Sequence, residues 1–206
     1  MGNIQSAKPY LQWINETIRL DSLANSAKGR KVYRGQVYWC CFGINIGSEQ
    51  SDKRPCVIIQ NDKGNLSSPN TIVAPITHTN STLDIVVPIS DKFDGSGNLI
   101  LDGHVLLGNI LTISKSRLEN FITSLSKNEM KKVDEAILKS AGIFSIVQQL
   151  EKRIEGQQRH IDNLDRDMKI KNESIQTLEA HIEELKKEVE ALKNLSNIND
   201  YNIDKK

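Results

Sequence analysis

The chain has 206 residues, which is room for one globular domain with an attached segment or for two small domains. Its 27 basic and 26 acidic residues give a net charge of +1, which excludes a protein that coats nucleic acid through a generally basic surface. Hydrophobic residues make up 38% and aromatic residues 5% of the chain. Because a compact domain has roughly 45–50% apolar residues, part of this chain is expected to lie outside a packed core.

The cysteines and the hydropathy limit the environment. Cys40 and Cys41 are adjacent and Cys56 stands alone, so the sequence holds no disulfide framework and indicates a reducing compartment. We therefore expect a cytoplasmic protein. The sequence shows no ligand spacing typical of zinc, and we expect neither a metal nor a cofactor. No apolar run reaches the ~18 residues of a transmembrane helix, and no contact with a membrane is expected.

The N-terminal segment, residues 1–29, is predicted to be a helical extension. Between Pro9 and Ala27 the apolar residues recur near helical spacing, and they are Leu11, Trp13, Ile14, Ile18 and Leu20. The resulting amphipathic helix is expected to pack on the following domain or on a partner.

Residues 30–146 are predicted to form one domain that is mainly β with helices. Short runs of strand-forming residues alternate with turn-forming clusters, and these runs are 36–42, 56–59, 71–74, 84–87 and 104–107. Strands of this length and spacing are typical of a small antiparallel barrel or half-barrel.

A helix is predicted directly after this β region. Ser126 and Glu129 have the spacing of a capping box. A flanking staple and an apolar stripe accompany it, formed by Leu125, Met130, Val133 and Ile137. The helix is expected to end near Ala141, with Gly142 as its terminator.

Residues 147–195 carry seven consecutive heptads and predict a long coiled-coil helix. The a positions are Val147, Ile154, Ile161, Met168, Ile175, Ile182 and Val189. The d positions are Leu150, Gln157, Leu164, Lys171, Leu178, Leu185 and Leu192. β-Branched residues at a with leucine at d favour a parallel dimer. The alternatives are pairing with a second protein or a helix that folds back on its own domain. Residues 196–206 are expected to be a disordered tail.

The β region also contains a series of short motifs in a fixed order. They are Arg34-Gly35-x-Val37-Tyr38, Gly47-Ser48-Glu49-Gln50, Arg54-Pro55, Ile59-Gln60-Asn61-Asp62, Ser68-Pro69, Ala74-Pro75-Ile76-Thr77, Thr112-Ile113-Ser114-Lys115 and Arg117-Leu118. Together these motifs resemble the MazF/PemK (Kid) family of toxin endoribonucleases over about residues 33–144.

The resemblance implies an SH3-like barrel of the CcdB/Kid type that forms a homodimer. It also implies the toxin of a type II toxin–antitoxin system, an mRNA interferase that cuts single-stranded RNA at short sequences. The implied reaction is a metal-independent attack of the ribose 2′-hydroxyl on the adjacent phosphate, which leaves a 2′,3′-cyclic phosphate and a 5′-hydroxyl. A cognate antitoxin is the implied protein partner, and the coiled coil is expected to add a second dimer contact.

Arg54 and Thr77 match the family's catalytic arginine and threonine. The reaction adds negative charge to the phosphate, and a guanidinium binds phosphate oxygens while keeping its own charge. Thr77 offers a hydroxyl to a phosphate oxygen or to the 2′-hydroxyl. The alternatives are a structural ion pair for Arg54 and a plain strand-end hydroxyl for Thr77.

Further residues are expected to bind RNA, and they are Gly47, Ser48, Glu49, Gln50, Lys53, Thr112 and Lys115. Glu49 either acts as a general base or structures its loop, and His78 is a second candidate base because imidazole titrates near neutral pH. His104 is expected to pack within the fold.

One position departs from the family pattern. Leu111 stands where the family commonly has an arginine before the Thr-Ile pair. The loss of this charge favours an alternative function, in which the barrel is a catalytically weak module that binds nucleic acid or protein and the coiled coil oligomerises it. A gyrase poison is a third possibility, because CcdB shares the fold.

Overall fold

The computed structural model describes residues 4–79 and 81–203, with side chains placed for residues 7–79 and 81–193. The chain divides into two compact units that meet between residues 145 and 146. The first unit contains the sheet and the helices around it, and the second is one long helix. Each unit is described by itself.

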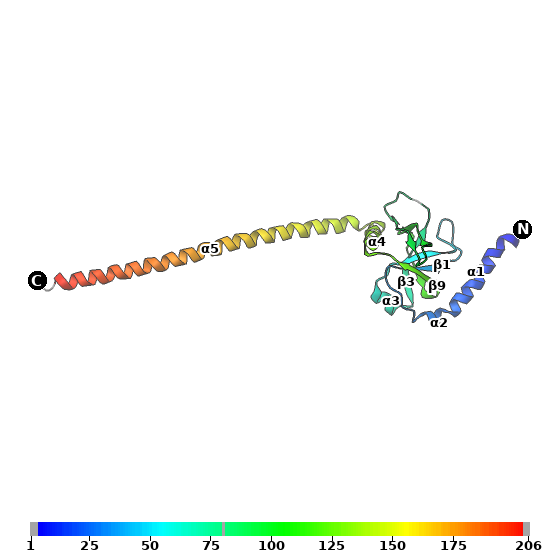
Figure 1. The fold of residues 1–206 in the computed structure, drawn as a ribbon, viewed down its shortest axis with the longest axis horizontal. Helices are drawn as coiled ribbons and strands as arrows, with labels where there is room; N and C mark the ends of the chain where they lie inside the picture. Colours follow the sequence, from blue (N-terminus) through cyan, green and yellow to red (C-terminus); the bar gives the residue numbers. More distant parts are fainter. Residues whose placement is uncertain (1–3, 80, 204–206) are drawn as a thin grey trace. The chain divides into compact units, whose positions relative to one another are not determined.

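The chain enters the first unit through α1 (Ile4–Ser22) and the short α2 (Ala24–Ala27), shown in blue in Figure 1. The sequence suggested that the helix starts at Pro9, but it begins earlier, and Pro9 lies inside it. Proline lacks a backbone N–H and so removes one backbone hydrogen bond, but here it does not end the helix. Leu20 is buried, whereas Leu11, Ile14 and Ile18 are exposed. The predicted apolar stripe is therefore split, with Trp13 and Leu20 packed and the other three side chains exposed.

Seven strands of the described chain form one antiparallel sheet, with β1, β3 and β9 labelled in Figure 1. Their order is β4-β7-β3-β2-β1-β9, and β8 pairs with the first half of β3. The bounds are β1 (Gln36–Cys41), β2 (Lys53–Ile58), β3 (Asn70–Thr77), β4 (Val86–Pro88), β7 (His104–Leu106), β8 (Leu111–Ser114) and β9 (Leu118–Ser124). A separate hairpin joins β5 (Lys92–Phe93) to β6 (Leu99–Leu101). The predicted antiparallel β fold is confirmed.

Two strands that the sequence did not indicate, β8 and β9, complete the sheet. β9 has no apolar alternation, with Phe121 exposed and Leu118 buried, and its pairing with β1 is interrupted by register shifts. Its strand conformation is therefore decided by pairing to β1 and not by its own pattern.

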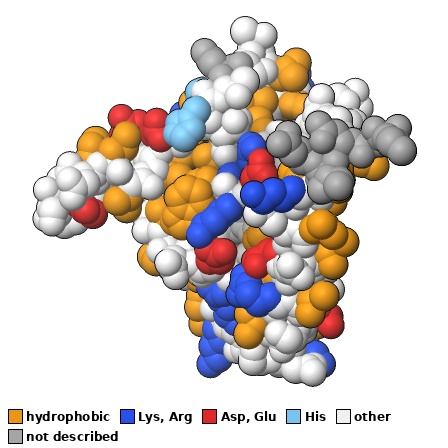
Figure 2. Space-filling view, turned by 90° about the vertical axis from the view of Figure 1, so that its right-hand side faces the viewer, with side chains coloured by type: hydrophobic (Ala, Val, Ile, Leu, Met, Phe, Trp, Pro, Cys, Tyr) orange, Lys and Arg blue, Asp and Glu red, His pale blue; other side chains and the backbone are white. Residues whose placement is uncertain are grey.

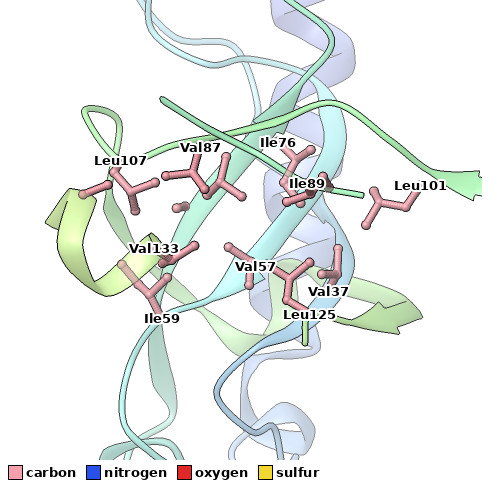
Figure 3. Close-up of a cluster of buried hydrophobic side chains, with 13 residues drawn as sticks. Val37, Val57, Ile59, Ile76, Val87, Ile89, Leu101, Leu107, Leu125 and Val133 are labelled. Carbon is pink, nitrogen blue, oxygen red and sulfur yellow. The ribbon is translucent and has the colours of Figure 1, made fainter. Parts of the chain in front are cut away.

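The sheet buries apolar side chains on both faces. Val37 and Val57 belong to a first cluster (Figure 3). In it, side chains from β1, β2, β3, β4 and β7 meet the helix α4 (Lys127–Ser140). Tyr38, Cys56 and Ile58 belong to a second cluster on the opposite side. Because successive residues of a strand point to opposite faces, β1 and β2 serve both clusters and lack a polar face.

The predicted capping box starts α4 (Lys127–Ser140). Ser126 accepts a hydrogen bond from the backbone N–H of Glu129, and the Glu129 carboxylate accepts one from the Ser126 N–H. Val133 is fully buried in the first cluster. Gly142 follows the helix with a φ of +72°, a left-handed conformation that glycine adopts at helix ends, so the expected terminator is confirmed.

The second unit is α5 (Phe144–Ile203), a continuous helix of 60 residues that begins at the end of the first unit. It extends past residue 195, where we expected a disordered tail, and residues 204–206 lie outside the described residues. The helix continues because the sequence after Gly156 contains neither proline nor glycine to stop it. Its apolar heptad positions from Leu150 to Leu192 stay about half exposed.

Candidate active site

Arg54 lies near the start of β2, and its guanidinium is held by the loop that joins β1 to β2. Nε donates to the backbone carbonyl of Ser51 at 2.8 Å, and Nη1 donates to Oε1 of Gln50. A guanidinium carries five N–H donors, so these two bonds leave donors free for a phosphate. The loop thus fixes the direction of the Arg54 side chain without neutralising its charge.

Thr77 is the last residue of β3. The antiparallel register of β2 with β3 pairs Cys56 with Pro75 at the end of this ladder, and Arg54 and Thr77 each lie two residues beyond that pair on the two neighbouring strands. The hydroxyl of Thr77 accepts from the backbone N–H of Thr79 at 3.3 Å. The two residues predicted as catalytic therefore lie on neighbouring strands, although they are 23 positions apart in the sequence.

Arg54 and Thr77 line the same pocket, which has a volume of about 330 Å³. Its remaining lining residues combine apolar, cationic, imidazole and carboxylate side chains, and they are Trp39, Lys53, Pro55, Ile76, His78, Ile100, Leu101 and Asp102. A cation, a hydroxyl and an imidazole beside an apolar wall suit a ligand that carries both phosphate and base.

The turn between β6 and β7 closes tightly against the end of β3. Gly103 has a φ of +104°, and a Cβ atom at this position would lie 2.4 Å from the backbone carbonyl oxygen of Thr77. A glycine is thus needed for this approach. The preceding residue, Asp102, is placed beside His78, whose Nε2 lies 2.7 Å from Oδ1 of Asp102. The sequence indicated His78 but not its carboxylate partner.

The loop between β1 and β2 contains four of the predicted RNA-binding residues. Gly47 and Ser48 lie at its exposed tip. Glu49 accepts a hydrogen bond from the backbone N–H of Ile46 at 3.2 Å, which is the loop-structuring role considered for it. Gln50 binds Arg54. Glu49 and Gln50 also line a second pocket of about 320 Å³.

Lys53 lies at the border of the active-site pocket with an exposed side chain. Its ammonium forms an ion pair with Glu119 and stands 5.8 Å from the ring centre of Trp39. Thr112 is exposed on β8, where it pairs with Ile72 and lines neither pocket. Both residues are accessible to RNA, but only Lys53 adjoins Arg54.

Lys115 was expected to bind RNA, and its position contradicts this expectation. The residue is 1% exposed, and its ammonium donates to the backbone carbonyl of Asn65 at 2.5 Å. Burial lowers the pKa of the Lys115 ammonium from its usual value. Asn65 in turn accepts a bond from the Thr71 hydroxyl. Lys115 therefore joins α3 (Asp62–Ser67) to the end of β8 and does not reach the surface.

Leu111, which replaces the family's usual arginine, lines the second pocket next to Glu49 and Gln50. It is half-buried in β8 opposite Val73 and packs against the second apolar cluster. An apolar side chain thus stands close to the loop that holds Arg54. Among the described residues that line the pocket of Arg54, the other positively charged side chain is that of Lys53.

The surface charges are mixed. Figure 2 shows one face of the molecule, on which Lys and Arg side chains are interspersed with Asp and Glu and with apolar side chains. This face offers no uniformly basic patch, which agrees with the 13 basic and 11 acidic residues of the segment 30–146. Binding of a nucleic acid would therefore depend on a local site.

A metal cluster and a membrane-spanning helix are both absent from the described residues. Within residues 7–79 and 81–193, whose side chains are described, no group of three His, Cys, Asp or Glu side chains is placed to share a metal ion. No helix in the described part of the chain combines the length and apolar character needed to cross a bilayer.

Comparisons with known proteins agree with the motif order. Residues 33–141 match the family described as PemK-like, MazF-like toxin of type II toxin-antitoxin system. Endoribonuclease EndoA of Bacillus subtilis (strain 168) is 44% identical over 108 residues, which are 52% of this chain and 90% of that protein.

Solved structures are similar to about half of the chain. An endoribonuclease from a mycobacterial species has 23% identity and a TM-score of 0.46, covering 55% of this chain and 94% of that one. MazF from Deinococcus radiodurans has 17% identity and a TM-score of 0.48, covering 55% and 98%. The family match alone spans more than half of the sequence, which is sufficient to assign the chain to that family. The chain belongs to the family of PemK-like, MazF-like toxins of type II toxin–antitoxin systems.

Proposed function

We propose that this chain is the toxin of a toxin–antitoxin pair and acts as an endoribonuclease on single-stranded RNA. The observation that carries the proposal is the shared pocket of Arg54 and Thr77 within the region that matches the toxin family. The 44% identity to an endoribonuclease over that region supports the same activity.

In the proposed reaction, the 2′-oxygen of a ribose attacks the adjacent phosphorus while the bond to the 5′-oxygen breaks. Arg54 stabilises the additional negative charge on the phosphate oxygens with the donors that Gln50 and Ser51 leave free. Thr77 orients the 2′-hydroxyl or a phosphate oxygen. The products are a 2′,3′-cyclic phosphate and a 5′-hydroxyl, and no metal ion takes part.

RNA is proposed to enter across the exposed loop tip and the pocket. Gly47, Ser48, Lys53 and Thr112 are accessible and contact the strand, while Glu49 and Gln50 hold the loop and Arg54. Among the described residues that line the pocket, Lys53 is the cation beside Arg54, and one such charge suits a short recognition sequence better than long-range binding along the RNA backbone.

The proposed partners are a cognate antitoxin, which would occupy the RNA site, and a second copy of the chain. We place the dimer contact in the β domain and a further contact in the heptad stripe of α5, whose apolar side chains are about half exposed. The proposed location is the cytoplasm, where the RNA substrate is found.

The test is cleavage of an unstructured RNA by the purified full-length chain in EDTA. Arg54→Ala is expected to lower kcat/KM by roughly 10²–10³-fold, the usual cost of losing a group that stabilises developing charge. Arg159→Ala, the same change on α5, is the matched control and should cleave like the wild type.

Equal cleavage by Arg54→Ala and the wild type would refute the role of Arg54. A wild-type chain that binds RNA but leaves it intact would instead favour the binding module suggested by Leu111.

A further inference from the structure

The proposed reaction needs a group that accepts the proton of the 2′-hydroxyl. Arg54 keeps its charge at every physiological pH and cannot accept a proton, and a threonine hydroxyl is a poor acceptor. A lysine ammonium donates hydrogen bonds and has no acceptor site, so Lys53 does not fill this role. Arg54, Thr77 and Lys53 therefore supply charge stabilisation and orientation but no general base.

His78 lines the same pocket and directly follows Thr77. Among the described side chains that line this pocket, His78 supplies the imidazole. Imidazole is the side-chain group whose ordinary titration range includes neutral pH. Its side chain is 78% exposed, so the ring is accessible to a bound RNA strand.

Asp102 orients this imidazole. The distance of 2.7 Å joins Nε2 of His78 to Oδ1 of Asp102. A carboxylate accepts only, so Nε2 carries the hydrogen and Nδ1 is left with its lone pair. The close approach of Gly103 to the Thr77 carbonyl fixes the Asp102 turn against the end of β3. The ring is thus tied through Asp102 to the turn that closes against the end of β3.

We propose that His78 is the general base of the reaction and that Asp102 is its positioning residue, an assignment that rests on the proposed ribonuclease function. Nδ1 takes the proton of the 2′-hydroxyl as the 2′-oxygen bonds to phosphorus. The bond from phosphorus to the 5′-oxygen breaks, and that oxygen takes a proton from water. The imidazolium then releases its proton to solvent, so atoms and charge balance.

The other candidate base, Glu49, is engaged elsewhere. Its carboxylate accepts from the Ile46 N–H and lines the second pocket, not the pocket of Arg54 and Thr77. The charged groups that share the pocket with His78 are Lys53 and Arg54 from β2 and Asp102 from the turn before β7. His104 on β7 pairs with Thr77 in the sheet and is the competing imidazole.

The experiment is the pH dependence of kcat for cleavage of a short RNA by the full-length protein. With an imidazole as the general base, kcat is expected to rise about tenfold per pH unit at low pH and then to level off. The change of slope is expected between about pH 5 and 8. His78→Gln is expected to remove this rise and to lower kcat at pH 7 by at least about 100-fold. Asp102→Asn should give a smaller loss, and His160→Gln on α5 should leave the profile unchanged.

Binding of an RNA with a 2′-O-methyl group at the cleavage site measures affinity without turnover. Wild-type affinity in His78→Gln supports a role in chemistry. A wild-type pH profile in His78→Gln, or loss of the rise in His104→Gln instead, overturns the assignment while leaving the ribonuclease function intact. A wild-type protein that cuts no RNA overturns the proposed function, and the base assignment with it.

Discussion

At the scale of single residues, the proposed reaction depends on hydrogen bonds that fix the orientation of the reacting side chains. Arg54 was recognisable from its motif, but its orientation depends on Gln50 and on the carbonyl of Ser51. Gln50 was expected to contact RNA, and the structure instead bonds its side-chain carbonyl to the guanidinium. In the proposed reaction, Gln50 therefore acts through Arg54.

Gln50→Ala is expected to lower kcat about tenfold, because a hydrogen bond to a charged group contributes roughly 1.5–3 kcal/mol. KM should change less, since the free donors of Arg54 remain. Steady-state cleavage of a short RNA measures both constants. Ile46→Ala, at an 84% exposed position of the same loop, is the control. Equal kcat values for the two variants would show that Gln50 does not position Arg54.

A second residue-scale contact lies away from the pocket. Glu129 closes the capping box of α4 and also accepts from the Ser90 N–H and from Lys92 at 2.9 Å. Burial alone raises the pKa of this carboxyl, but the hydrogen bonds from Lys92, Ser126 and Ser90 outweigh it and lower the pKa to about 2.

This pKa predicts a loss of stability in acid. Because the folded pKa is below the ordinary value of 4.5, the stabilisation is complete above about pH 4.5 and is lost as the pH falls toward 2. Such a change corresponds to roughly 3 kcal/mol at neutral pH. Glu129→Gln should therefore unfold at lower urea concentration at pH 7, with a smaller difference from wild type at pH 3.

The control for this prediction is Glu135→Gln on the same helix, where the side chain is 52% exposed and its ion pair with Lys139 contributes little. If Glu129→Gln and Glu135→Gln have the same urea midpoint at pH 7, the carboxylate of Glu129 does not stabilise the fold.

At the scale of elements, α1 supports the loop that joins β1 to β2 and binds Arg54. Trp13 packs so closely on Gly43 that a Cβ atom there would lie 2.2 Å from the indole ring. The guanidinium of Arg117 stands 5.3 Å from the same ring and donates to the backbone carbonyls of Cys41 and Phe42. These contacts lie where the loop leaves β1. The contact of Trp13 comes from a helix outside the family match, whereas Arg117 lies within the match, just after β8.

Trp13→Ala is expected to loosen the base of this loop. The lost packing and cation–π contact correspond to about 1–2 kcal/mol. The amide of Asp52, which donates to the Gly43 carbonyl, should then exchange with solvent about tenfold faster. Hydrogen exchange measured with NMR or mass spectrometry tests this. Ile18→Ala, at an exposed position of α1, should leave the exchange rate unchanged, and a similar rate in both variants would contradict the supporting role of Trp13.

At the scale of the whole molecule, two units with separate structural requirements share one chain. The first buries two apolar clusters and contains the pocket. The second is a helix whose apolar heptad positions have no described partner side chain and stay half exposed. A single helix with such a stripe gains stability by packing the stripe against another surface.

A peptide of residues 146–206 is therefore expected to associate and to be mostly helical. Ile161→Lys, at a heptad a position, should lower the midpoint of its thermal transition and its state of association. Gln176→Lys, at a position outside the seam, is the matched control. Circular dichroism and analytical ultracentrifugation measure the two properties. A peptide that remains monomeric would show that α5 requires a different partner.

Several features could be predicted from the sequence because their signals are local. The capping box of α4, Gly142 and the heptads depend on residues within a few positions of one another. The ordered motifs identified the toxin family and singled out Arg54 and Thr77, which the sheet then placed in one pocket.

Contacts between distant residues were decided by the tertiary structure. Lys115 belongs to a polar motif of the kind expected at the surface. It is nevertheless buried, and its ammonium donates to a backbone carbonyl 50 positions away. The pairing of His78 with Asp102 spans 24 positions and depends on the Gly103 turn meeting the end of β3. A side chain's burial and hydrogen-bond partners depend on which strands the fold brings together, and no local pattern in the sequence encodes them.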